Sequence, residues 1–98
     1  MKLVPMKPNI QQQFADALTQ TGVDLKQAGA DVALFTAQRG AHVASVAAAN
    51  EPGLEQVMRD EQDRCFLFAT GRTVRSGDVA DAQAWSLFRG FLIGVATA

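Results

Sequence analysis

Arg39 and His42 are the first residues whose types suggest chemistry, because His42 is the only histidine in the chain. Both lie in the alanine-rich run TAQRGAHVASVAAAN, residues 36–50. Side chains three residues apart share a helix face, and such a pair suits proton transfer or anion binding. The chain contains no tyrosine, and no nucleophile stands beside the pair. We therefore favour a packing role, in which both side chains bond across a symmetric interface or reach solvent at its edge.

A second cluster with chemical potential is acidic and comprises Asp60, Glu61 and Asp63. A divalent cation needs oxygen ligands that converge from one face or loop, whereas these three side chains fan around a helix. Charged residues spaced four apart instead predict ion pairs on a solvated face, namely Glu55–Arg59, Arg59–Asp63 and Asp60–Arg64. We expect a charged helix surface here and no metal.

The single cysteine, Cys65, is followed by Phe66, Leu67 and Phe68. One cysteine excludes an internal disulfide and a multi-cysteine metal site. Nothing near it in the sequence would lower the pKa of its thiol, so we interpret Cys65 as a small core residue. A catalytic pair with His42 would require two separate helices to bring the side chains together, and we disfavour it.

The segment GRTVRSGD, residues 71–78, is the most site-like stretch of the chain. Arg72 and Arg75 supply positive charge, and the start of a following helix supplies unpaired N–H groups, so both arginines are candidate anion-binding residues for a phosphate. The segment does not match the phosphate-loop patterns GxxxxGKS or GxxxxGKT. The ordinary interpretation is a glycine that ends one helix, a solvated turn and a cap for the next helix, and we favour it.

Composition limits the protein to a small globular class. The 98 residues make one domain, 48% of them hydrophobic and 19% charged, with a net charge of −1. This balance argues against charge-driven binding to nucleic acid. The most apolar stretch, residues 84–98, is shorter than the roughly 20 residues that span a bilayer and contains Arg89. Residues 1–9 lack the apolar run of a signal peptide, so we expect a cytoplasmic protein or one within a virion.

Helical signals run through most of the chain, and no alternating strand pattern competes with them, so the sequence predicts an all-α fold. Pro5 and Pro8 predict an extended arm over residues 1–9, followed by a single helical domain over residues 10–98. Asn9 suits the cap of a helix that begins at Ile10. Helical signals continue to about residue 49 and form either one long helix or two helices with a bend near Gly22, where Thr21 and Asp24 resemble a capping box.

Residues that typically begin or end helices predict two further helices in the second half of the chain. Pro52 suits the first turn of a helix that runs to about residue 69, and Gly71 suits the position after its end. Asp78 is a suitable cap for the last helix, residues 79–96. That helix presents a wide apolar face and is the expected hydrophobic anchor; any part of this face that the monomer leaves uncovered would be an interface.

Residues 10–49 are apolar on two faces, which is typical of a central helix. One face repeats every 3.5 residues, the spacing of helix-on-helix packing. The other is a row of alanines, Ala30, Ala33, Ala37, Ala41, Ala44 and Ala48, next to Gly40. A chain this short has few other elements that could cover both faces. We therefore predict a homo-oligomer. Its expected interface contains Phe14, Leu18, Leu25, Val32, Phe35, Arg39, His42 and Val46. We also expect Leu3, Val4 and Met6 of the arm to be held by a neighbouring chain.

The second half of the chain resembles small helical proteins of bacteriophage genomes. The resemblance rests on RDEQDRCFLFATG, residues 59–71, and SLFRGFLIGVATA, residues 86–98. These proteins combine an acidic and basic helix, a short glycine loop and a short apolar helix at the C-terminus. The resemblance implies a phage or mobile-element origin and transfers no site and no activity.

Two functions are consistent with these features. The first is a non-enzymatic, homo-oligomeric structural or assembly protein, such as a phage virion component. The second is a small phage-type inhibitor or binding protein that acts on a host partner or sequesters a phosphate-containing ligand through Arg72 and Arg75. We expect no enzyme and no cofactor, because the residues offer no adequate catalytic constellation.

Overall fold

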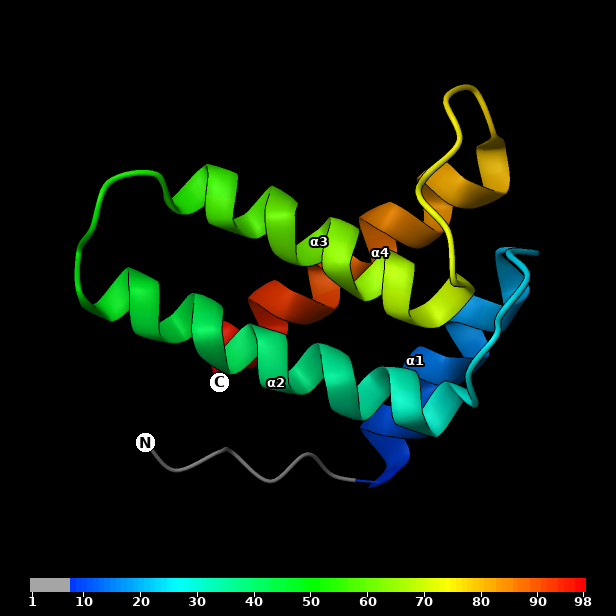
Figure 1. The fold of residues 1–98 in the computed structure, drawn as a ribbon. Coiled ribbons are helices and arrows are strands. Elements are labelled where there is room, and N and C mark those ends of the chain that lie inside the picture. Colours follow the sequence, from blue (N-terminus) through cyan, green and yellow to red (C-terminus); the bar gives the residue numbers. More distant parts are fainter. Residues whose placement is uncertain (1–7) are drawn as a thin grey trace.

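A computed structural model describes residues 8–98, which form four α-helices and no strand. The helices are α1 (Pro8–Gln20), α2 (Gly29–Ala48), α3 (Leu54–Thr70) and α4 (Val79–Ala96), and Figure 1 shows their order along the chain. The predicted all-α fold is confirmed. Residues 1–7, which include the apolar arm residues Leu3, Val4 and Met6, lie outside the described residues.

Helix α1 begins earlier than the sequence predicted, at Pro8 rather than after a cap at Asn9. Proline is well tolerated in the first turn of a helix, because the N–H it lacks would have no partner inside the helix there. The prediction of an extended arm that reaches residue 9 is therefore wrong for its last two residues.

The junction between α1 and α2 separates the first segment into two helices. Gly22 adopts a φ of 83°, which glycine reaches without the strain that a Cβ would cause. The Thr21 hydroxyl donates to the carbonyl of Leu18 and accepts from the N–H of Val23. Thr21 therefore closes α1, and the predicted capping box is wrong, since α2 begins only at Gly29.

The other helix ends follow the sequence signals closely. Gly71 ends α3 with a φ of 76°, and its N–H donates to the carbonyl of Leu67. The Asp78 carboxylate accepts from the N–H of Asp81 at 3.0 Å and caps α4, as predicted. Pro52 is the exception, because it lies in the turn before α3, and Gly53 occupies the cap position with a φ of 86°.

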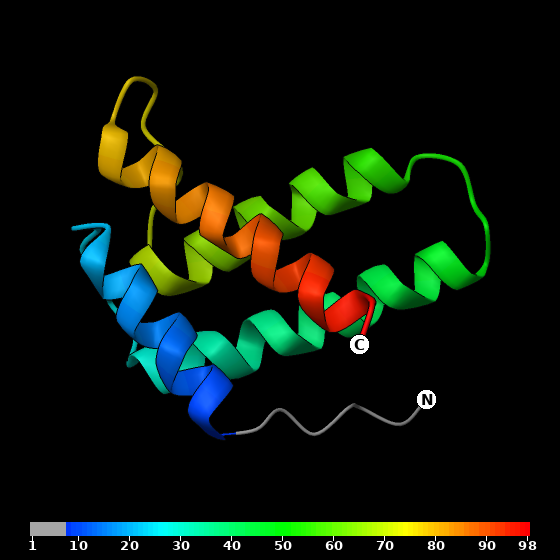
Figure 2. The same ribbon diagram turned by 180° about the vertical axis from the view of Figure 1, so that it is seen from behind.

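Helices α2 and α3 form an antiparallel hairpin, and α4 crosses behind both of them (Figures 1 and 2). Helix α1 packs against α2 and α4. The molecule measures 36 × 30 × 17 Å, so its thinnest dimension is about two helix layers deep. Helix α2 contacts all three other helices. Its predicted central position is confirmed, but helices of the same chain cover it, so its two apolar faces no longer require a second chain.

Helix α4 packs closely against α2 at Gly40. A Cβ atom built on Gly40 would lie 2.7 Å from the Cβ atom of Val95 and 3.3 Å from the carbonyl oxygen of Leu92. The two backbones therefore approach more closely than any larger side chain would allow. The core between the helices contains Phe14, Leu18, Val23, Val32, Ala33, Val43, Met58, Cys65, Phe66, Ala69, Ala84, Phe88 and Leu92.

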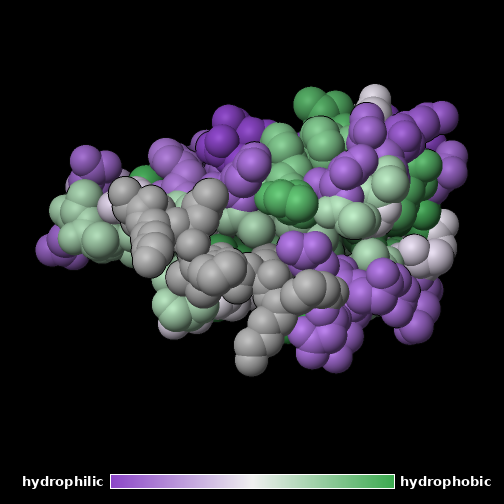
Figure 3. Space-filling view, turned by 90° about the horizontal axis from the view of Figure 1, so that it is seen from below, coloured by the Kyte–Doolittle hydropathy of each residue, from purple (hydrophilic) through white to green (hydrophobic). Residues whose placement is uncertain are grey.

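Polar and apolar side chains are mixed on the molecular surface, as the face in Figure 3 shows. Among the described residues, no helix is both long enough and apolar enough to cross a membrane.

Candidate functional site

Arg39 and His42 do not form a joint site. The guanidinium of Arg39 points to α3 and donates to both carboxylate oxygens of Glu61 through Nε and Nη2. Glu61 is only 2% exposed. His42 is exposed on α2. The packing interpretation therefore fits Arg39, although its partner is in the same chain rather than across an interface.

The buried carboxylate of Glu61 forms ion pairs with two arginines. Arg64 lies 3.5 Å from it on the outer side of the ion pair with Arg39. The hydrogen bond to Glu61 raises the pKa of Arg39 above its ordinary value, so this guanidinium carries its charge throughout the accessible pH range. The cluster is fully paired and joins α2 to α3. We assign it a structural role.

Within the described residues, Cys65 is not an activated thiol and the acidic side chains do not form a metal site. Cys65 is fully buried, and burial raises the pKa of its thiol to about 12, which makes the thiol a poor nucleophile. Because His42 is exposed, the pair of Cys65 and His42 is not assembled. Within residues 8–98, no three His, Cys, Asp or Glu side chains are placed to hold a metal ion.

The carboxylates of α3 have partners that differ in part from the predicted ones: Asp60 accepts from Gln56 within the helix, and Asp63 bonds to α4. Of the three pairs spaced four apart, Glu55–Arg59 is present at 3.3 Å in the described residues. Glu55 also binds Arg89 of α4 at 2.6 Å, which lowers the pKa of Glu55. Asp63 accepts from the indole N–H of Trp85, so this carboxylate bonds to α4 instead of to Arg59.

A buried glutamine completes this contact between α3 and α4. Gln62 is fully buried; its amide donates to the carbonyl of Trp85 and accepts from Arg89. The nitrogen and the oxygen of this side chain amide are thus both hydrogen-bonded within the chain. Part of the charged face predicted for α3 therefore bonds to α4 and holds the two helices together.

In the arginine loop, Arg72 and the backbone of Arg75 both bind the carboxylate of Asp81. Arg72 donates to both oxygens of this carboxylate, at 2.7 and 2.8 Å, and lies over the ring of Phe66. The backbone N–H of Arg75 donates to the same carboxylate at 2.8 Å. Asp81 is 1% exposed, and the Arg72 hydrogen bonds, with that of Arg75, lower its pKa to about 2. Arg72 is therefore engaged by a carboxylate of its own chain. Arg75 lines a surface hollow with Ser76, Gly77 and Asp78, and anion binding by these two arginines stays a prediction.

The monomer itself buries part of the predicted oligomer interface. Leu18 and Val32 are fully buried, so these two positions cannot also face a second chain. Phe14 is 5% exposed and lines a groove on the surface. Leu25, Phe35 and Val46 are partly buried. The ring of Phe35 stacks on that of Phe68 of α3 with centroids 4.1 Å apart.

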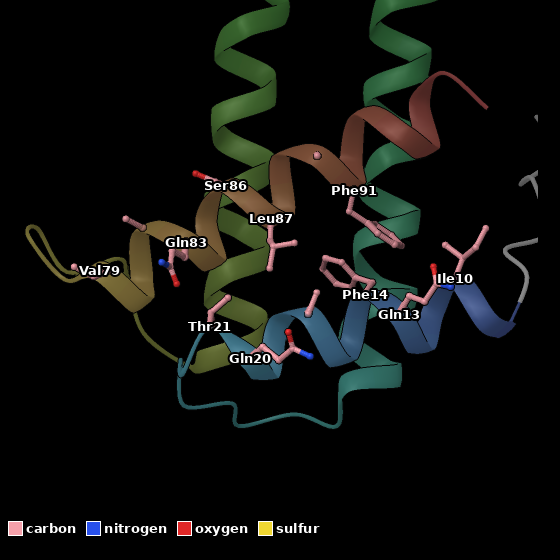
Figure 4. A pocket seen from close by; sticks show the side chains of 13 residues that line it. Ile10, Gln13, Phe14, Gln20, Thr21, Val79, Gln83, Ser86, Leu87 and Phe91 are labelled. Carbon is pink, nitrogen blue, oxygen red and sulfur yellow. The ribbon is translucent and has the colours of Figure 1, made fainter.

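A broad concave surface lies between α1 and α4. It is an open groove of about 930 Å³, and Figure 4 shows Phe14, Leu87 and Phe91 directed into the space between the two helices. Ile10 and Val79 lie at its opposite ends and are 43% and 70% exposed. The remaining lining residues are Gln13, Ala17, Gln20, Thr21, Ala82, Gln83, Ser86 and Gly90.

No charged side chain lines this groove, although 19% of the chain is charged. Its polar groups are hydroxyls and amides, which suit a partner surface that also lacks charge. Sequence reasoning found the core face of the last helix but missed this second face. The signal was present as small or apolar residues at Val79, Ala82, Ser86 and Gly90, spaced by three and four, yet only the fold shows that α1 leaves them uncovered.

Comparisons of this chain with protein-family models, curated proteins and solved structures found no match. Its function must therefore be argued from the groove and the polar clusters themselves.

Proposed function

We propose that this protein is a non-enzymatic, self-associating structural or assembly protein, and that it acts through the uncharged groove between α1 and α4. The groove is the observation that carries the proposal. Exposed apolar residues at both of its ends and an aromatic floor are typical of protein-binding surfaces. The polar clusters support the same conclusion, because Arg39, Glu61, Arg72 and Asp81 are engaged in ion pairs within the chain.

Two sequence features support an assembly role in a virion. The second half of the chain resembles small phage proteins, and a domain of this size gains burial by association. The phosphate-binding alternative has less support, since Arg72 already binds Asp81 through both of its terminal nitrogens and only Arg75 lines the hollow at the start of α4.

Sedimentation velocity of the purified protein over a range of micromolar concentrations tests the proposal. We expect a dimer or larger species that dissociates on dilution. Val79→Asp should raise the dissociation constant by roughly tenfold or more, because association would bury an unpaired carboxylate. The variant should keep the monomer fold, since an acidic residue in the first turn of a helix is favourable.

Leu54→Asp is the matched control. Leu54 is the first residue of α3, as Val79 is of α4, and it is 39% exposed but does not line the groove. This variant should associate like the wild type. A wild-type protein that sediments as a monomer at high micromolar concentration would refute the proposed function.

A further inference from the structure

The outer face of α4 has a symmetric pattern. Val79, Ala82, Ser86, Gly90 and Ile93 follow one another at intervals of three, four, four and three residues, which places them on one stripe of the helix. All five are exposed. The large apolar residues stand at the two ends, with Val79 70% and Ile93 42% exposed. The three small residues between them leave a hollow, and a Cβ built on Gly90 would meet nothing within 4 Å.

The pattern reads the same in both directions about Ser86. If two copies of α4 cross antiparallel at this residue, Val79 of one copy lies opposite Ile93 of the other, and Ala82 lies opposite Gly90. Small residues at the crossing let two helices approach closely, while the larger ends pack against each other. The stripe is thus complementary to itself, which is the property that a two-fold contact requires.

Charge favours the same occupant. Helix α4 contains only two charged residues, Asp81 and Arg89. Both face partners in their own chain, namely Arg72 for Asp81 and Glu55 with Gln62 for Arg89. No charged side chain lines the groove, and Arg75 and Asp78 lie beside Val79 in a second hollow at the N-terminal end of the stripe. An antiparallel contact places these end charges of the two copies at opposite ends of the crossing, so that they do not meet like charges of the other copy.

Resting on the proposed self-association, we infer that the partner in the groove is a second copy of this chain, whose α4 packs antiparallel against α4 across a two-fold axis at Ser86. Each α4 then forms one wall of its own groove and enters the groove of its partner beside α1. The occupied groove becomes a four-helix contact made of α1 and α4 from both copies. Its floor of Phe14, Leu87 and Phe91 is covered, which removes the exposed apolar surface of the monomer.

Disulfide cross-linking tests this register, because a disulfide requires Cβ atoms about 3.5–4.5 Å apart. Ser86→Cys should form a covalent dimer on mild oxidation, since the residue lies opposite itself on the axis. Leu54→Cys, an exposed position outside the groove, is the control and should stay monomeric on a non-reducing gel. The native Cys65 is fully buried. The wild-type protein, oxidised in the same way, measures any background cross-linking by this thiol.

A second pair of variants tests the direction of the crossing. Val79→Cys and Ile93→Cys, one of them carrying a tag, should cross-link with each other when mixed. Neither should cross-link with itself, because positions 79 and 93 are 14 positions apart in the sequence, which separates like positions of the two copies by about 21 Å along the helices. Self-linked Val79→Cys would indicate a parallel contact and would overturn the inference.

Sedimentation separates the failure of the inference from that of the function. If the wild type dimerises but Ser86→Cys does not cross-link, the two-fold contact is wrong and self-association stands. If the wild type is a monomer, both are wrong.

Discussion

Asp81 accepts three hydrogen bonds from its own chain, and we expect its position to make the fold sensitive to acid. Arg72 donates to it twice, and the backbone N–H of Arg75 donates once. These bonds lower the pKa of Asp81 from 3.8 to about 2. A carboxylate whose pKa is lower in the folded state stabilises the fold above its unfolded pKa, and this contribution disappears as the pH falls through the folded pKa.

We therefore expect the melting temperature of the wild-type protein to fall between about pH 5 and pH 2, in part because of Asp81. Asp81→Asn should lower the melting temperature at pH 7 and reduce its further fall in acid. Asp60→Asn is the control, since Asp60 is exposed and accepts from Gln56 on the surface; it should leave the profile unchanged. Thermal melts by circular dichroism at each pH measure these changes. An Asp81→Asn variant that kept the full acid dependence of the melting temperature would contradict the prediction.

At the scale of elements, the crossing of α2 and α4 depends on one missing side chain. Gly40 is buried, and its neighbour Val95 leaves no space for a methyl group. Glycine inside a helix normally costs about 1 kcal/mol relative to alanine, so its presence here reflects packing rather than helix propensity.

Gly40→Ala should therefore destabilise the protein by about 1–3 kcal/mol through overpacking, despite the better helix propensity of alanine. Gly94→Ala on α4 is the matched control, because a Cβ there meets nothing within 4 Å; it should stabilise by about 0.5–1 kcal/mol. Urea unfolding measures both. Adding Val95→Ala to Gly40→Ala should recover part of the loss, and the absence of recovery would mean that the strain lies elsewhere.

At the scale of the whole molecule, the two sides of α4 differ in burial. Leu92 is fully buried in the monomer core, whereas its neighbour Ile93 is 42% exposed. One side of the helix therefore supports the fold of a single chain, and we assign the other side to a second copy.

Alanine at these two positions should separate folding from association. Leu92→Ala should cost about 2–5 kcal/mol of unfolding free energy at any protein concentration, because it leaves a cavity. Ile93→Ala should change the monomer little and reduce only the rise of the melting temperature with concentration, which reports association. Melts over a hundredfold range of concentration distinguish the two. An equal, concentration-independent loss in both variants would argue against a second use of α4.

The sequence by itself determined the helical class and most of the helix ends of this protein. Caps and glycines act through a few neighbouring backbone groups, so Asp78 and Gly71 were recognisable from local pattern alone. The buried role of Cys65 followed from its neighbours in the same way. Local pattern was ambiguous near Gly22, where a bend and a full break have similar signals, and at Pro8 and Pro52, where proline suits a turn and a first helical turn alike.

Only the tertiary structure decided which charges pair and which faces remain open. Arg39 with Glu61, Arg72 with Asp81 and Arg89 with Glu55 lie 22, 9 and 34 residues apart, beyond the reach of helix periodicity. The same holds for burial: periodicity showed that residues 10–49 have two apolar faces but not that α4 covers one of them. A helix face is identical in sequence whether its own chain or another covers it, and the path of the whole chain determines which of the two occurs.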